Sequence, residues 1–232
     1  MPRIVPILLA SAAVLAAGAA HAADRAFPVG GFDHIRSSVP FDVRVHTGPG
    51  PSVLARGPQQ ALDRLIVEVV HGELVIRSQS GRWWSGWNWH RERAIVEVTV
   101  PMLTGATLSG PGDLTIDRIQ ARSFGATLNG PGDLSVGQID TGDLTLVLNG
   151  PGDLTMAGRA ANARITLRGP GEVRANGLSV RDATISLSGP GDVTLRASGK
   201  VTGSLSGPGD ITVQGGARCT ISKHGPGEVH CG

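Results

Sequence analysis

The sequence predicts an all-β fold, a single-stranded parallel β-helix with about 18–20 residues per coil. Gly-Pro-Gly followed by an acid occurs seven times, and the acids follow one another at intervals of 20, 20, 19, 20, 18 and 18 residues. A fixed period of this size is typical of stacked units that share one core. On both sides of each copy apolar and polar residues alternate, which is the pattern of β-strands with one buried face.

The Gly-Pro-Gly-acid segment is the predicted corner of each coil. Proline fixes φ near −65° at the second position of a type II turn, and glycine permits a positive φ at the third. Two strands joined by such a corner form one coil, and the general hand of parallel crossovers favours a right-handed helix. Antiparallel hairpins are the weaker alternative, because a meander has no reason to repeat one corner. We expect roughly seven regular coils over residues 104–232, with irregular coils over 23–103.

The apolar positions recur at fixed distances from each corner, so stacked coils should form internal ladders of like residues. The column directly after the acid consists of Leu114, Leu134, Leu154, Val173, Val193, Ile211 and Val229.

The first 22 residues are expected to be a secretory signal peptide. They are apolar from Ile4 onward and end in the small-residue cleavage pattern Ala20-His21-Ala22. We therefore expect residues 23–232 to form one exported domain in the periplasm, at the cell surface or in the medium. No later apolar stretch is long enough to predict a transmembrane span.

The irregular part before the repeats also alternates like strands, at residues 41–45, 74–76 and 94–100, and 58–65 is predicted to be a short helix that begins at Pro58. A loop at 82–93 interrupts this part, and all four tryptophans of the chain lie in it. The indoles either fold back over the solenoid or form an exposed patch that binds a protein, a glycan or a membrane interface. The candidate binding residues are Trp83, Trp84, Trp87 and Trp89.

If the coils stack in register, the seven acids form a row along one edge. Like charges about 5 Å apart repel, and two arrangements would relieve this. Each carboxylate accepts N–H bonds within its own turn, or adjacent carboxylates share bound calcium, since carboxylate oxygens are the ligands that calcium prefers. No other cofactor is indicated. The candidate calcium ligands are Asp113, Asp133, Asp153, Glu172, Asp192, Asp210 and Glu228.

The two cysteines, Cys219 and Cys231, fall in the last coil with the same inward parity. In an oxidising compartment they are predicted to form a disulfide that closes the open end of the stack. The alternative is a zinc site that adds His224 and His230, although this spacing matches no familiar zinc motif. Lys223, at a position where the other coils carry leucine, indicates a terminal coil with a polar cap.

Composition favours a binding or structural protein over an enzyme. Lys and Arg number 21 against 19 Asp and Glu, so no basic surplus indicates nucleic acid. The chain has no tyrosine and no G-x-S-x-G nucleophile motif, and its acids recur on every coil instead of converging at one place. A polysaccharide lyase or hydrolase built on a β-helix stays the enzymatic alternative.

The repeats resemble the putative auto-transporter adhesin, head GIN domain family, whose members carry the segment Leu-Ser-Gly-Ser-Gly-Asp-Leu. The matching segments here run over residues 108–114 and 128–134 and recur to the end of the chain, with proline in place of the second serine. The resemblance covers roughly residues 27–232. It implies a pectin-lyase-like β-helix, an exported protein and a role in cell adhesion, and it brings no catalytic residues. A purely structural envelope protein is the remaining alternative.

Overall fold

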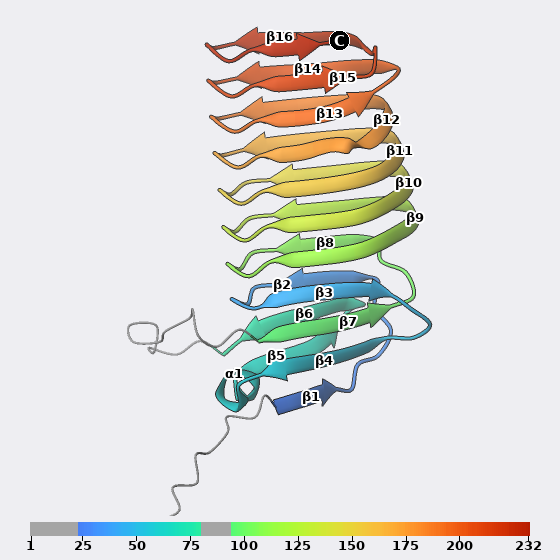
Figure 1. Cartoon of the computed structure of the whole chain (residues 1–232), viewed down its shortest axis with the longest axis vertical. Coiled ribbons are helices and arrows are strands. Elements are labelled where there is room, and N and C mark those ends of the chain that lie inside the picture. Colours follow the sequence, from blue (N-terminus) through green and yellow to red (C-terminus); the bar gives the residue numbers. More distant parts are fainter. Residues whose placement is uncertain (1–22, 80–93) are drawn as a thin grey trace, which may run out of the picture.

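The computed structural model describes residues 23–79 and 94–232, and in them the chain is a β-solenoid of about six turns (Figure 1). All 17 described strands belong to one continuous hydrogen-bonded sheet. The predicted parallel β-helix is therefore confirmed. The solenoid has about six turns, whereas about seven regular coils were expected.

Each regular coil is a long strand that bends once and then returns to the next Gly-Pro-Gly corner. In Figure 1 the corners lie on the left and the bends on the right. The first regular coils consist of β8 (Gly105–Leu108), β9 (Leu114–Leu128), β10 (Leu134–Leu148), β11 (Leu154–Arg168) and β12 (Val173–Ser188). The last coils consist of β13 (Val193–Ala197), β14 (Lys200–Ser206), β15 (Ile211–Gln214), β16 (Arg218–His224) and β17 (Val229–Cys231).

The solenoid therefore has two flat sides and two edges. The first face is formed by the strand residues after each corner, such as 134–137, and the second face by those after the bend, such as 143–148. The corner edge carries the Gly-Pro-Gly segments. The register shifts between neighbouring coils lie near the bend edge, as between Val136 and Ile139. Coils of 18, 19 and 20 residues thus keep their corners aligned.

The core is a set of ladders of like residues from successive coils. Leu134 is paired in register with Leu114 on one side and Leu154 on the other, and all three are fully buried. One hydrophobic cluster extends from Phe32 to Val213. This continuity explains how units of about twenty residues, each too short to bury a face alone, form a stable domain.

The corner glycines are required by close stacking of the coils, and the predicted type II turn is wrong. The glycine after each proline does not have a positive φ; a positive φ occurs instead at the first glycine of the last four copies, between 128° and 135°. A Cβ on Gly132 would overlap the carbonyl oxygen of Gly112 in the preceding coil. The N–H of Gly132 donates to the carbonyl of Gly110 at 3.3 Å, so the two backbones are in direct contact there.

An eighth corner, not recognised from the sequence, lies at residues 38–42 between β2 (His34–Ser37) and β3 (Asp42–Thr47). The register of β2 with β8 and of β3 with β9 places it directly against the corner at 109–113. Pro40 and Asp42 match the motif, but Val39 and Phe41 occupy the two glycine positions. Both of these side chains are buried.

The coil of β2 and β3 lies between the first regular coil and the coil formed by β6 (Glu73–Ser78) and β7 (Ile95–Val100). The irregular coils therefore do not stack in chain order. The segment that joins β6 to β7 has no Gly-Pro-Gly motif in its sequence, unlike the corners of the regular coils.

Antiparallel strands cover the N-terminal end of the stack, where only irregular coils were expected. β4 (Ser52–Gly57) pairs antiparallel with β1 (Ala23–Phe27) and with β7, and β5 (Leu65–Val70) forms a hairpin with β6. The predicted helix is confirmed as α1 (Gln59–Asp63), with Pro58 as its N-cap. Such atypical terminal units protect the exposed end of a solenoid core.

The predicted disulfide between Cys219 and Cys231 is confirmed, with the two Cα atoms 6.4 Å apart. Neither sulfur is therefore a thiolate, so the zinc alternative loses two of its ligands. The cysteines stand in register with Val201 and Val213 of the preceding coil. Lys223 stands in register with Leu205 and is exposed, as expected for a terminal cap.

Candidate functional site

The acids of the repeats form a row along the corner edge, where their carboxylates bind the backbone of the next coil. The N–H of Asp133 donates to Oδ1 of Asp113 at 3.0 Å, and the N–H of Asp153 donates to Oδ1 of Asp133 at 2.9 Å. Asp153, Asp192 and Asp210 accept in the same way from the acids that follow them. The acceptor was expected within the same turn, and that expectation is wrong: each bond joins two coils.

These bonds explain why aspartate predominates in the row. Glu172 follows the pattern as a donor through its N–H, but its longer side chain forms an ion pair with Arg174 at 2.6 Å. Arg174 also pairs with Asp153 at 2.8 Å. An aspartate carboxylate is short enough to reach the amide of the neighbouring coil, and this bond takes the place of a backbone acceptor at the corner.

The row of acids is thus part of the scaffold. In the described residues no three or more His, Cys, Asp or Glu side chains come together in a way that could hold a metal ion. Calcium binding by the row stays a prediction.

Replacing Asp133 with alanine should lower the free energy of unfolding by about 1 kcal/mol, because the N–H of Asp153 loses its acceptor. Asp133→Asn keeps an acceptor oxygen, so its free energy of unfolding should remain close to that of the unmodified protein. Thermal melting of both variants, with and without calcium chloride, checks this. A calcium-dependent rise in melting temperature that Asp133→Asn abolishes would instead show that the carboxylates bind the metal.

The tryptophans proposed as binding residues, Trp83, Trp84, Trp87 and Trp89, lie outside the described residues. The flanking strands are described, and β6 and β7 place the ends of the segment at the corner edge. Binding by these side chains stays a prediction.

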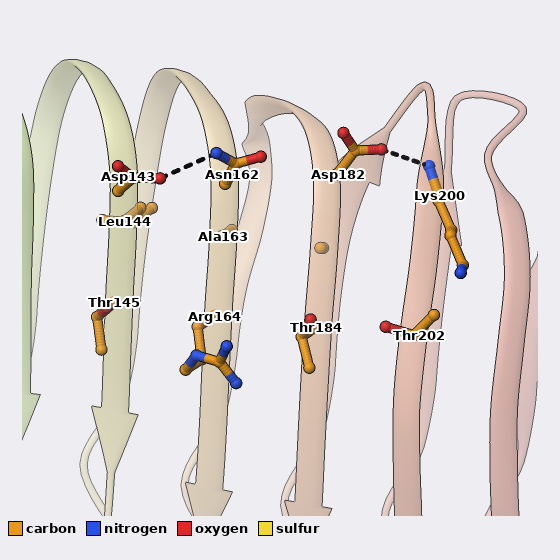
Figure 2. Close-up of a pocket in the computed structure, with 11 residues that line it drawn as sticks. Asp143, Leu144, Thr145, Asn162, Ala163, Arg164, Asp182, Thr184, Lys200 and Thr202 are labelled. Carbon is orange, nitrogen blue, oxygen red and sulfur yellow. Dashed lines mark hydrogen bonds between the residues drawn. The ribbon is translucent and has the colours of Figure 1, made fainter.

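An open groove of about 510 Å³ lies on the second face beside the bend edge, across β10, β11, β12 and β14 (Figure 2). This groove was not recognised from the sequence. Its lining residues stand in regular register on the four strands, but alternation of residues does not reveal that the surface is hollowed there.

One side of the groove is a row of polar side chains tied to one another. Oδ1 of Asp143 accepts from Nδ2 of Asn162 at 2.9 Å, as Figure 2 shows. Asp182 accepts from the backbone N–H of Lys200 and from Nε of Arg181, both at 2.9 Å. The N–H of Lys200, and then Arg181, lower the pKa of Asp182 below its ordinary value. Both carboxylates are therefore engaged by protein donors.

The other row of the groove carries hydroxyl groups and a guanidinium group. Thr145, Arg164, Thr184 and Thr202 stand in register on four successive coils. The second face continues beyond them as a flat surface with Thr166, Ser186 and Ser204 in the next outward column. Such an array offers donors and acceptors at the regular spacing of strands, about 4.8 Å.

One histidine, carboxylate and hydroxyl cluster lies away from the groove. Nδ1 of His34 is 2.8 Å from Oδ1 of Asp33 and 3.4 Å from Oγ1 of Thr104. A catalytic relay needs the carboxylate and the hydroxyl on opposite ring nitrogens, whereas both contacts here use Nδ1. The hydrogen bond from His34 is the main cause that lowers the pKa of Asp33. This cluster ties the start of β2 to the segment before β8.

The fold, the repeated corner and the row of acids agree with a known family. The family model described as the putative auto-transporter adhesin, head GIN domain, matches residues 31–217. The chain belongs to this family. No curated protein matches the sequence.

Three solved structures are similar to this member of the GIN domain family. A putative adhesin from Bacteroides fragilis has a TM-score of 0.83 and 20% identity, over 91% of this chain and 97% of that one. A putative adhesin from Parabacteroides merdae has a TM-score of 0.70 and 16% identity, over 90% and 95%. A putative lipid binding protein from Parabacteroides distasonis has a TM-score of 0.69 and 17% identity, over 91% and 96%. At these identities the likeness shows the fold alone.

None of the helices described in residues 23–79 and 94–232 has the length and apolar character needed to cross a membrane. The disulfide, together with the adhesin family, is consistent with an exported protein.

Proposed function

We propose that this protein is an exported, non-catalytic binding protein that attaches to molecules of a cell surface through the second face of its solenoid. The observation that carries the proposal is the groove with its flat surround, where hydroxyl, amide and charged groups from four coils face outward. Adhesion is the role that the family description suggests. The disulfide supports an oxidising location, in the periplasm or at the cell surface.

A polysaccharide-active enzyme is the less favoured alternative. Such an enzyme needs paired acids or an acid and a base that converge on one bond. In the described part of the chain, the acids of the repeats hold the corners together and the two acids of the groove are bound by protein donors. The tryptophan segment, predicted from the sequence to be a binding loop, would be a second binding surface for the same function.

The test compares two threonines of neighbouring strands that face opposite sides. Thr184 lies on the second face and Thr194 on the first, and both are partly exposed. Thr184→Phe should abolish binding of the purified protein to intact cells and to a panel of surface glycans, because the ring fills the groove. Thr194→Phe should bind normally, and both variants should melt near the temperature of the unmodified protein.

Equal binding by the two variants would contradict the proposal. Loss of binding only after replacement of Trp84, Trp87 and Trp89 would move the binding surface to the tryptophan segment. Release of reducing sugar from a glycan by the purified protein would support the enzymatic alternative.

A further inference from the structure

The second face carries an uneven distribution of charge. In the regular coils, from β8 to β16, only Asp143 and Asp182 are acidic among the strand residues of this face, and both lie at its margin beside the bend edge. The cationic residues on the same strands are Arg164, Arg168, Lys200, Arg218 and Lys223. Apart from its margin, this surface therefore presents positive charge and hydroxyl groups.

The two acids of the groove form no ion pair with Arg164 or Lys200, although the charge of Lys200 contributes to lowering the pKa of Asp182. Asp143 is bound by Asn162, and Asp182 is bound by Arg181 and by the backbone N–H of Lys200. In Figure 2 the side chain of Lys200 extends away from Asp182 along the groove. Within residues 23–79 and 94–232, neither the guanidinium group of Arg164 nor the ammonium group of Lys200 has a hydrogen bond or an ion pair. Two cationic groups thus stand in one groove with their donors open to a ligand.

We propose that the groove binds an acidic polysaccharide, whose carboxylate or sulfate oxygens are held by Arg164 and Lys200. The guanidinium group of Arg164 offers a planar pair of donors that fits an oxyanion, and Lys200 adds a second positive charge two coils away. Thr184 stands between the coils of the two charges and Thr145 and Thr202 stand beside them, so their hydroxyl groups can bind the sugar rings. This inference rests on the proposed binding function and names the class of its ligand.

The shape and lining of the groove favour a polymer of sugars over a lipid. The groove is open and crosses four strands, so a long polymer can lie across it without inserting a chain end. Its outward side chains are threonines, an amide and charged groups, and no aromatic or large aliphatic side chain extends into it from outward positions. An acyl chain would gain little burial of apolar surface there.

Binding to three polymers tests the inference: polygalacturonate with carboxylates, dextran sulfate with sulfates, and neutral dextran. We expect the unmodified protein to bind one or both charged polymers and to bind dextran much more weakly. The double variant Arg164→Gln, Lys200→Gln should raise the dissociation constant about tenfold, the loss expected from two exposed charge contacts. A rising salt concentration should weaken polymer binding by the unmodified protein more steeply than binding by the variant. Arg164→Lys, which keeps the charge but loses the planar pair of donors, should weaken binding less than the double variant does.

The matched control removes two positive charges from the first face. Arg44 and Arg196 are exposed there, and Arg44→Gln, Arg196→Gln should change the dissociation constant less than twofold. Melting temperatures of all variants show whether each is folded. Equal weakening by both double variants would overturn the inference, because net charge alone would then explain it. Tighter binding to vesicles containing phosphatidylglycerol than to either acidic polymer would also overturn it.

The outcome separates this inference from the proposed function. A protein that binds cells or neutral glycans but neither acidic polymer would refute the acidic ligand and leave the binding function standing. A protein that binds neither cells nor any glycan would refute both.

Discussion

Replacing Gly132 with alanine should lower the free energy of unfolding by about 2 kcal/mol or more. The added Cβ would overlap the carbonyl oxygen of Gly112, and no side chain can rotate away to relieve a contact between two backbones. The coils must separate at the corner, which also weakens the hydrogen bond from the N–H of Gly132 to Gly110. For a chain of this size the melting temperature should fall by about 4–8 °C.

The control is a glycine that lacks this contact. Gly125 lies in β9 on the second face, and a Cβ there would have no neighbour within 4 Å. Gly125→Ala should be neutral or slightly stabilising, because glycine in a strand has more freedom to lose on folding. Melting of both variants gives the answer, and similar losses at the two positions would show that the corner glycines are not fixed by stacking.

Replacing Leu134 with alanine should lower the free energy of unfolding by about 3 kcal/mol. Leu134 is fully buried between Leu114 and Leu154 of the neighbouring coils, so the truncated side chain leaves a cavity that a stacked ladder cannot close easily. Chemical denaturation followed by circular dichroism measures the loss. A drop of less than about 1 kcal/mol would argue against a continuous core at this coil.

Thr155 supplies the matched control for this ladder. It is the next residue after Leu154, points outward from the first face and is exposed. Thr155→Ala should change the free energy of unfolding by no more than about 0.5 kcal/mol. The pair therefore compares an inward and an outward position of the same strand pattern.

The regular coils could be predicted from the sequence because one corner recurs with little change. The repeat period predicted the stacking of coils, and the alternation of residues predicted the inward columns. The shared inward position of Cys219 and Cys231 in the last coil predicted the disulfide. The role of the corner glycines was misjudged, since a turn considered alone suggests a positive φ, whereas the actual constraint comes from the neighbouring coil. A single sequence does not show which backbone lies 4.8 Å away.

The eighth corner and the groove could not be predicted for a related reason. At residues 38–42 only Pro40 and Asp42 match the motif, so a search for Gly-Pro-Gly followed by an acid does not reveal this corner. The groove joins residues such as Asp143 of β10 and Lys200 of β14, which lie four strands apart along the chain. Their register follows the spacing to the next corner and is regular. The sequence pattern does not show which outward side chains leave a hollow between them.

Hydroxyl-radical footprinting of the free protein and of the protein bound to intact cells tests the central claim most directly, because it identifies the side chains that binding covers. The account predicts reduced oxidation in peptides that contain residues 143–149, 162–168 and 182–188, and unchanged oxidation on the first face, such as 134–137 and 154–157. The tryptophans at 83–89 react readily with radicals and serve as an internal comparison. Protection of that segment alone, or of the first face, would contradict the claim that the second face is the binding surface.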